Sequence, residues 1–154
     1  MDATKPIEQL MTRDPLAWCA PHDSLNDAAN LMWDQDCGAI PVVEDGRVVA
    51  MLSDQDICMA AYLQSRRLTE LAVSSAMSQC VHSCGLGDSV EDVCQLMGVH
   101  QVRRLPVTDG EGRLVGVVSL SDLIGGANSG QAIRLLETLK KISERRLPSE
   151  VPEQ

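Results

Sequence analysis

Residues 38–57 read GAIPVVEDGRVVAMLSDQDI, and residues 105–123 read LPVTDGEGRLVGVVSLSDL. In each stretch, two runs rich in β-branched residues flank a turn that contains Asp-Gly, which is the pattern of a β-hairpin. Each hairpin ends in Ser-x-x-Asp, beginning at Ser53 and at Ser119, directly before a further apolar run. The two stretches therefore predict the same strand–turn–strand–helix unit twice.

The similarity continues upstream of both hairpins. Leu10-Met11-Thr12 matches Ala76-Met77-Ser78, and Leu31-Met32 matches Leu96-Met97. Matches that keep one order along the chain indicate an internal duplication, here of a unit of ~60 residues. We divide the chain into a first repeat with its N-terminal segment (1–66), a second repeat (67–127), and a C-terminal helix with a disordered tail (128–154).

Each repeat predicts the element order β-α-β-β-α. Ser24 and Ser89 are helix N-cap signals, and apolar residues recur at helical spacing after them. Residues 16–19 and 81–84 are expected to add a short first strand. A second helix begins at each Ser-x-x-Asp, runs to about residue 65 in the first copy, and is cut short by Gly125-Gly126 in the second. The fold class is α/β (α+β).

The sequence also predicts the character of four further segments. Residues 125–130 are Gly-rich and predict a flexible linker, and residues 131–145 predict a helix with a Glu137–Lys141 pair and an apolar stripe of Ile133, Leu136, Leu139 and Ile142. The helix over 57–63 is apolar on all sides, so it requires burial on more than one side. Residues 147–154 contain two prolines and are expected to be disordered.

Composition restricts the class of function. The chain has 154 residues, with 13 Lys and Arg against 22 Asp and Glu, which gives a net charge of −9. This charge disfavours nucleic acid and anionic membranes as partners. No apolar run is long enough to span a membrane, and the N-terminus lacks the apolar core of a signal peptide, so we expect a cytoplasmic protein.

The six cysteines favour packing over metal chemistry. The chain has no CxxC pair, and its metal-like spacings are Cys80-x-His82-x-Cys84 and Cys19-x-x-His22. Structural zinc sites usually begin with a two-residue gap between cysteines. We therefore predict no metal site and treat the cysteines as small apolar residues.

The duplication, the element order and the two Ser-x-x-Asp motifs resemble a tandem pair of cystathionine-β-synthase (CBS) domains. The resemblance covers roughly residues 5 to 126. It implies two units packed sheet to sheet about a pseudo-twofold axis, with two clefts that bind adenine nucleotides or S-adenosylmethionine in members of the family. It also implies pairing of two modules through their helices, so we expect a homodimer.

The resemblance assigns roles to the motifs. Ser53 and Ser119 correspond to residues that hold phosphate, and Asp56 and Asp122 to residues that hold ribose. A helix N-terminus offers free N–H groups to phosphate, and a carboxylate accepts from both ribose hydroxyls. The alternative is a capping box that satisfies only the helix itself. The other expected ligand-binding residues are Arg103, Arg104, Ile40, Pro41, Leu105, Pro106, Val118, Leu16, Val81 and His82.

The two copies differ where phosphate would bind. Arg103 and Arg104 precede the second hairpin, whereas Gly38 and Ala39 stand in the first. Basic residues here commonly meet the ligand phosphate in nucleotide-sensing members of the family, and a solvated strand edge is the alternative role. Trp18 is a candidate for stacking on a base or for packing. We expect Asp122 to matter more for nucleotide binding than Asp56.

Two functions remain open from the sequence. The first is a regulatory sensor that needs no cofactor, binds AMP, ADP, ATP or S-adenosylmethionine, and signals through its dimer shape or an effector protein. The second is a dimeric scaffold whose Ser-x-x-Asp motifs act only as caps, with Cys/His chemistry as a switch. We find no nucleophile elbow, Walker loop, dinucleotide fingerprint or zinc-protease motif, so an enzyme is not expected. The ligand, the number of competent clefts and the effector are not specified by the sequence.

Overall fold

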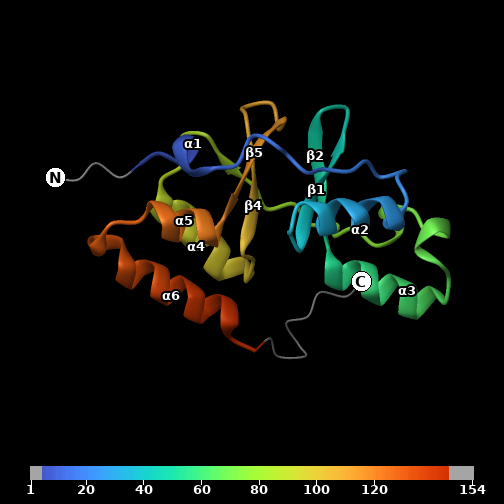
Figure 1. Cartoon of the computed structure of the whole chain (residues 1–154). Helices are drawn as coiled ribbons and strands as arrows, with labels where there is room; N and C mark the ends of the chain where they lie inside the picture. Colours follow the sequence, from blue (N-terminus) through green and yellow to red (C-terminus); the bar gives the residue numbers. More distant parts are fainter. Residues whose placement is uncertain (1–4, 146–154) are drawn as a thin grey trace.

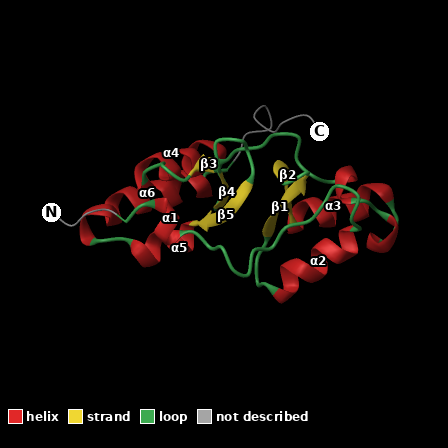
Figure 2. Ribbon diagram, turned by 90° about the horizontal axis from the view of Figure 1, so that it is seen from above, coloured by secondary structure: helices red, strands yellow, loops and turns green. Residues whose placement is uncertain are grey.

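Each repeat folds into a small sheet with two helices on one face (Figures 1 and 2). The computed structural model describes residues 5–145. The first repeat contains α2 (Leu25–Asp34), β1 (Ala39–Glu44), β2 (Arg47–Ser53) and α3 (Asp54–Gln64). The second contains β3 (Cys84–Gly85), α4 (Val90–His100), β4 (Arg104–Thr108), β5 (Leu114–Ser119) and α5 (Leu120–Gly126). The predicted α/β fold of two repeats is confirmed.

The two hairpins have the same register. Ile40 pairs with Leu52 in the antiparallel β1–β2 hairpin, and Leu105 pairs with Val118 in β4–β5. The short β3 runs parallel to β4. The corresponding strand of the first repeat, expected at 16–19, is reduced to a single parallel bridge from Cys19 to Val42.

The segments that lead into the repeats exchange between the two sheets. Thr12 pairs with Val117 of β5, and the backbone N–H of Ser78 donates to the carbonyl of Met51 in β2 at 2.9 Å. A Cβ on Gly116 would lie 2.6 Å from the Met11 sulfur and 3.1 Å from the Thr12 carbonyl oxygen, so glycine here leaves room for the N-terminal segment to approach β5. The packing thus crosses the boundary that we place at residue 66, and that boundary stays a prediction.

Two apolar cores follow from this exchange. One core lies in the second repeat but includes Ile7 of α1 (Ile7–Leu10) and Met11. The other lies in the first repeat but includes Leu71 and Val73. Leu71 follows the short 3-10 turn at Leu68–Glu70, and Val73 begins the one at Val73–Ser75. Each repeat therefore needs the other's leading segment to complete its interior.

The C-terminal helix α6 (Ala132–Ser143) folds back along α4 (Figure 1). It buries Leu135 and Thr138 and partly buries Ile142, whereas the rest of the predicted stripe, Ile133, Leu136 and Leu139, is exposed. The helix is confirmed, and most of its predicted stripe stays exposed, because α6 carries apolar residues on two overlapping faces and its contact with α4 buries the one that contains Leu135.

Two other details around α6 differ from the sequence prediction. Residues 125–130 are not a flexible linker: α5 continues to Gly126, and Asn128 and Gln131 cap a 3-10 turn (Ser129–Gln131) through reciprocal hydrogen bonds of 3.1 Å. Glu137 pairs with Arg134 at 3.9 Å, because the Lys141 stem lies against Gly98 of α4.

Helix α3 exposes more side chains to solvent than the burial predicted for a helix that is apolar on all sides. Ile57 and Ala60 are buried, whereas Met59, Tyr62 and Leu63 are exposed. Among the described helices, none combines the length and apolar character needed to cross a membrane. The tail at 147–154, expected to be disordered, lies outside the described residues.

Candidate functional site

Both Ser-x-x-Asp motifs form capping boxes. The N–H of Ser53 donates to Oδ2 of Asp56 at 2.9 Å, and the N–H of Asp56 donates to the Ser53 hydroxyl oxygen at 3.1 Å. Ser119 and Asp122 repeat this arrangement at 2.8 and 3.1 Å. The box uses each serine oxygen as an acceptor, so the hydroxyl proton is left to donate elsewhere. Within the described part of the chain, Oδ1 of Asp122 accepts no hydrogen bond.

The same motif also begins the other two helices of the repeats. Ser24 caps α2 by accepting from the N–H of Asp27 at 3.0 Å, and Ser89 forms a full box with Asp92 on α4. Two hydrogen bonds from Ser89 lower the pKa of Asp92. The capping role is therefore real at all these helices, and the motif alone does not identify a ligand site.

The position of Ser119 distinguishes its box from those of α2 and α4. Ser119 ends β5 and pairs with Arg104, while the carbonyl of Arg103 accepts from the N–H of Leu120 at 2.8 Å. The structure thus brings Arg103, Arg104, Ser119 and Asp122 together at one end of the β4–β5 hairpin. Within residues 5–145 neither arginine forms an ion pair.

The equivalent end of the first hairpin has the same backbone without the cations. Ser53 pairs with Ala39, and the N–H of Asp54 donates to the carbonyl of Gly38 at 2.9 Å. Small residues occupy both positions that hold arginines in the second repeat. An anion at this end would therefore meet the dipole of α3 and the Ser53 hydroxyl, but no adjacent guanidinium.

The charge of Arg104, in the second repeat, acts on the thiol of Cys37 in the first repeat. Burial raises the pKa of the Cys37 thiol, and the positive charge of Arg104 opposes that rise. Cys37 directly precedes β1 of the first repeat. The arginine end of the second repeat therefore faces the start of the first repeat's hairpin.

The apolar residues expected to contact a base lie in two different environments. Ile40, Leu105 and Val118 are in the cores and at most 1% exposed, so their side chains are covered by the helices. Pro41 and Pro106 alternate with core residues along their strands and are also buried. Their carbonyls accept from the thiols of Cys19 and Cys84, at equivalent places in the two repeats.

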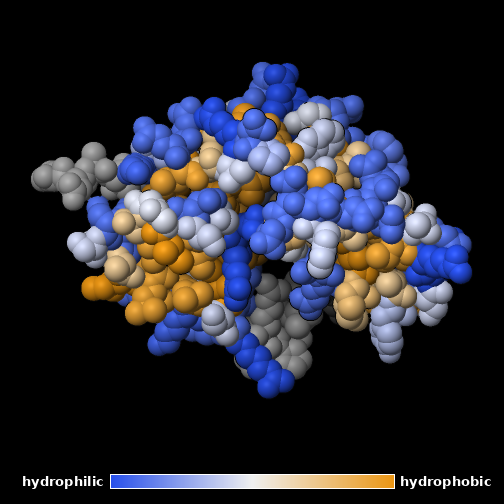
Figure 3. Space-filling model, viewed as in Figure 1, coloured by the Kyte–Doolittle hydropathy of each residue, from blue (hydrophilic) through white to orange (hydrophobic). Residues whose placement is uncertain are grey.

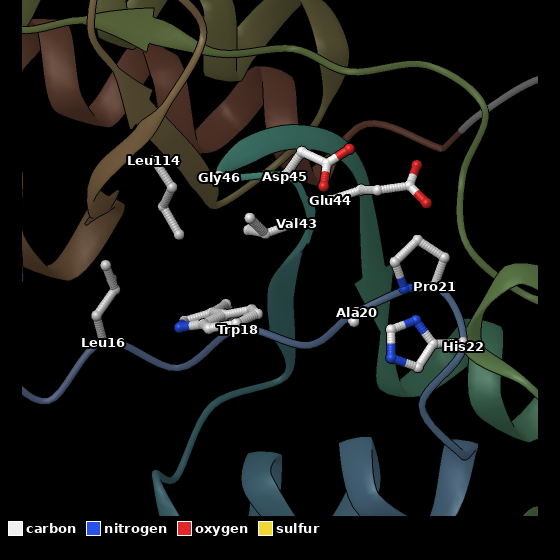
Figure 4. A pocket seen from close by; sticks show the side chains of 10 residues that line it. All are labelled: Leu16, Trp18, Ala20, Pro21, His22, Val43, Glu44, Asp45, Gly46 and Leu114. Atoms are coloured by element: carbon white, nitrogen blue, oxygen red, sulfur yellow. The ribbon is translucent and has the colours of Figure 1, made fainter.

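Leu16 lines an open pocket of about 530 Å³ at the turn end of the β1–β2 hairpin (Figure 4). Trp18, which is 49% exposed, lies on one side of it near Leu16, and Glu44, Asp45 and His22 lie towards the other. The hairpin turn and Ser53 are at opposite ends of β2. This pocket is therefore separate from the Ser-x-x-Asp boxes.

Val81 and His82 precede β3. The His82 ring stacks on His100 of α4, with centroids 3.4 Å apart and planes 12° from parallel. Burial lowers the pKa of His82, and the neighbouring His100 lowers it further. The sequence analysis missed this pair, because the two histidines lie on different elements and share no spacing pattern.

The cysteines are all unbridged thiols. Cys19, Cys84 and Cys94 are buried, whereas Cys58 and Cys80 are exposed. Burial, followed by the charge of a nearby aspartate, raises the pKa of both Cys19 and Cys84 to about 12. In the described part of the chain, no three His, Cys, Asp or Glu residues are grouped to hold a metal ion.

Known proteins agree with this architecture. The family model for the CBS domain matches residues 7–62 and 73–127. A CBS domain-containing protein, YhcV of Bacillus subtilis, is 43% identical over 117 residues, which cover 76% of this chain and 81% of that protein. The crystal structure of Hypoxic Response Protein I with two coordinated zinc ions is 26% identical, with a TM-score of 0.73, and covers 80% of this chain and 100% of that one. The crystal structure of CBSX2 in complex with AMP is 25% identical, with a TM-score of 0.68, and covers 78% and 93%. The chain belongs to the CBS domain family, as a tandem pair of its domains.

Proposed function

We propose that this chain is a non-enzymatic regulatory module that binds an adenosine-type ligand between its repeats. AMP, ADP, ATP and S-adenosylmethionine are the candidates, and none is a required cofactor. The observation that carries the proposal is the group of Arg103, Arg104, Ser119 and Asp122 at one hairpin end. Two cations without ion pairs among the described residues, in a chain of net charge −9, form a local site for an anion.

Each residue of this group has a specific task in the proposed complex. The arginines neutralise phosphate, and the Ser119 hydroxyl donates to it at the N-terminus of α5. The free Oδ1 of Asp122 accepts from the ribose hydroxyls, while its Oδ2 stays bonded to the backbone and fixes the carboxylate. The AMP complex of CBSX2 supports this class of ligand. Ser53 and Asp56 offer a second, weaker site, because Gly38 and Ala39 replace the arginines.

The apolar residues complete the proposed clefts. Val81 and His82 lie on the segment that precedes the second hairpin and are the candidates for contact with the base, whereas Leu16 lines the separate pocket at the turn of the β1–β2 hairpin. Pro41 and Pro106 lie on the strands behind them. The core residues Ile40, Leu105 and Val118 would shape the sheet beneath the ligand without presenting their own surface.

A thermal-shift panel tests the proposal. AMP, ADP, ATP, S-adenosylmethionine and NAD are added separately at rising concentration. A ligand at 100 times its dissociation constant adds ~2.7 kcal/mol to the free energy of unfolding. For a chain of this size that raises the melting temperature by about 5–10 °C. A panel in which no ligand changes the melting temperature would contradict the sensor function.

That negative outcome would favour the second candidate, a dimeric scaffold. The observation on its side is that both capping boxes are fully formed by the protein's own atoms. In either function we propose a homodimer in the cytoplasm that communicates with an effector protein. Sedimentation equilibrium at micromolar concentration measures the dimer directly, and a monomer there would contradict it.

A further inference from the structure

The pocket at the turn end of the β1–β2 hairpin is built from three segments that are far apart in the sequence. Residues 16–22 form one wall, the turn after β1 forms the second, and Leu114 at the start of β5 contributes the third (Figure 4). The volume of about 530 Å³ lies within the range of about 300–1,000 Å³ that is typical of small-molecule sites. The Ser-x-x-Asp boxes lie at the other end of the strands, so this pocket is not the proposed nucleotide site.

Backbone hydrogen bonds hold the three walls together. The N–H of Cys19 donates to the carbonyl of Pro41 at 3.1 Å, and the N–H of Val43 donates to the carbonyl of Cys19 at 2.8 Å. The N–H of Leu114 donates to the carbonyl of Gly46 at 3.1 Å, which fixes β5 of the second repeat against the turn of the first. The pocket is therefore formed by the protein alone, and a ligand would not have to order its walls.

The two sides of the pocket differ in chemistry. The indole of Trp18, about half exposed, lies near Leu16 and Leu114 at one side, whereas the carboxylates of Glu44 and Asp45 lie towards the other (Figure 4). Within residues 5–145, neither carboxylate forms an ion pair. An apolar group fits against the indole, and a positively charged group fits beside the carboxylates.

The arginines near the two hairpin turns do not line this pocket. Backbone hydrogen bonds from Arg113 and Glu111 lower the pKa of Asp109, and the charges of Arg113 and Arg47 lower it further. Arg113 also forms an ion pair with Glu111 at 2.8 Å. Both guanidinium charges thus act on acidic groups of the second repeat's turn, and the carboxylates of the pocket are left to a cation from solution.

The pocket is a local feature of the first repeat. On the face shown in Figure 3, the larger hydrophobic areas lie over the helices, and the end that holds the hairpin turns is mainly hydrophilic. In the second repeat, Ser83 stands at the position of Trp18, and Asp109 stands at the position of Glu44. Oδ1 of Asp109 accepts from two backbone N–H groups of its own turn, at 2.8 and 3.0 Å. The second repeat therefore has neither the aromatic ring nor a carboxylate that is free of its turn.

We propose that this pocket binds a small amphipathic amine, with the apolar or aromatic group of the amine against Trp18 and its ammonium group beside Glu44 and Asp45. The face of an indole and a carboxylate both attract a cation, and the net charge of −9 adds to this attraction. The site lies apart from Arg103, Arg104 and the Ser-x-x-Asp boxes. The proposal goes beyond nucleotide binding, and either function can fail while the other holds.

The fluorescence of Trp18 measures this binding. The chain has two tryptophans, so in a Trp33→Phe background the signal comes from Trp18 alone. Addition of 2-phenylethylamine should change this fluorescence until it saturates. 2-Phenylethanol lacks the charge and ethylamine lacks the aromatic group, so each should bind about tenfold more weakly or worse. Absence of saturable binding, or equal binding of 2-phenylethanol, would overturn the proposal.

Paired substitutions test the residues by calorimetric titration with 2-phenylethylamine. Glu44→Gln with Asp45→Asn should weaken binding by about tenfold or more, and Trp18→Ala should abolish it. The matched control is Asp34→Asn with Asp36→Asn, which changes the net charge equally at exposed positions outside the pocket. Asp36 and Asp45 share a positive φ, of 48° and 51°, that asparagine also adopts. Melting curves show whether each variant is folded, and an equal loss of binding in both double variants would overturn the assignment to this pocket.

Discussion

Replacing Asp122 by alanine should weaken nucleotide binding more than it weakens the fold. The carboxylate has two separable tasks. Oδ2 accepts from the Ser119 N–H at 2.8 Å and closes the capping box, whereas Oδ1 is available to the ribose. Asp122→Ala removes both, so the stability change measures the cap and the affinity change measures the ligand contact.

The substitution should lower two quantities, the stability of the fold and the affinity for the ligand. Losing one helix cap costs about 1 kcal/mol, which lowers the melting temperature of a chain of this size by about 2–4 °C. Losing a charge-assisted hydrogen-bond pair to the ligand costs ~1.5–3 kcal/mol, which is about a 10- to 150-fold loss of affinity. Calorimetric titration with the nucleotide that gives the largest thermal shift measures the second quantity.

The first repeat supplies a matched control. Asp56 caps α3 with almost the same geometry, at 2.9 Å, but Gly38 and Ala39 stand where the second repeat has arginines. Asp56→Ala should therefore lower the melting temperature by a similar amount and reduce the affinity less. Asp92→Ala on α4 removes a box that is remote from the arginines and should leave the affinity unchanged. An affinity that depends equally or more strongly on Asp56 would refute the proposed asymmetry.

Two further predictions concern the thiols and the pH dependence. In native protein at neutral pH, a maleimide should label the exposed Cys58 and Cys80 rapidly. It should label the buried Cys19 and Cys84 only after unfolding, because burial raises the pKa of both thiols to about 12. The fold and the oligomer should persist in reductant with EDTA, and unfolding or dissociation under these conditions would favour a structural metal or disulfide. The pKa of His82 is lowered from 6.5 in the folded state, so the unfolded chain binds the proton more readily, and stability should be lost as the pH falls below about 6.5. His82→Gln should remove this part of the decline in melting temperature between about pH 7 and 5, and an unchanged decline would show that other groups cause it.

The hairpins were predictable because their signals are local. Asp45-Gly46 sets a tight turn, and Gly46 adopts the positive φ of 79° that such a turn requires. The strand pattern and the serine caps depend on neighbouring residues, and the duplication confirms each signal once more. Helix boundaries followed from these features to within a residue or two.

The details that failed depend on contacts between distant residues. Helix α6 carries Leu135 on one face and Leu136 on another, and the approach of Lys141 to Gly98 decides which is buried. The His82–His100 stack has no local signature. Ser-x-x-Asp was singled out at Ser53 and Ser119, yet it also begins α2 and α4, so only the pairing of Ser119 with Arg104 gives one copy a distinct chemical setting.

The two repeats differ in chemistry at equivalent positions. The second repeat has Arg103 where the first has Gly38, and it has the flat Gly98, covered by α6, where the first has the protruding Trp33. The proposed anion site lies in the second repeat, and the uncovered helix face belongs to the first. Cys37 lies near both features. It lines a hollow beside α2 and α3 of the first repeat, and the charge of Arg104 opposes the rise that burial causes in the pKa of its thiol. A phosphate that neutralises Arg104 would change the electrostatic potential at that hollow, which Asp36 and Asp54 also line.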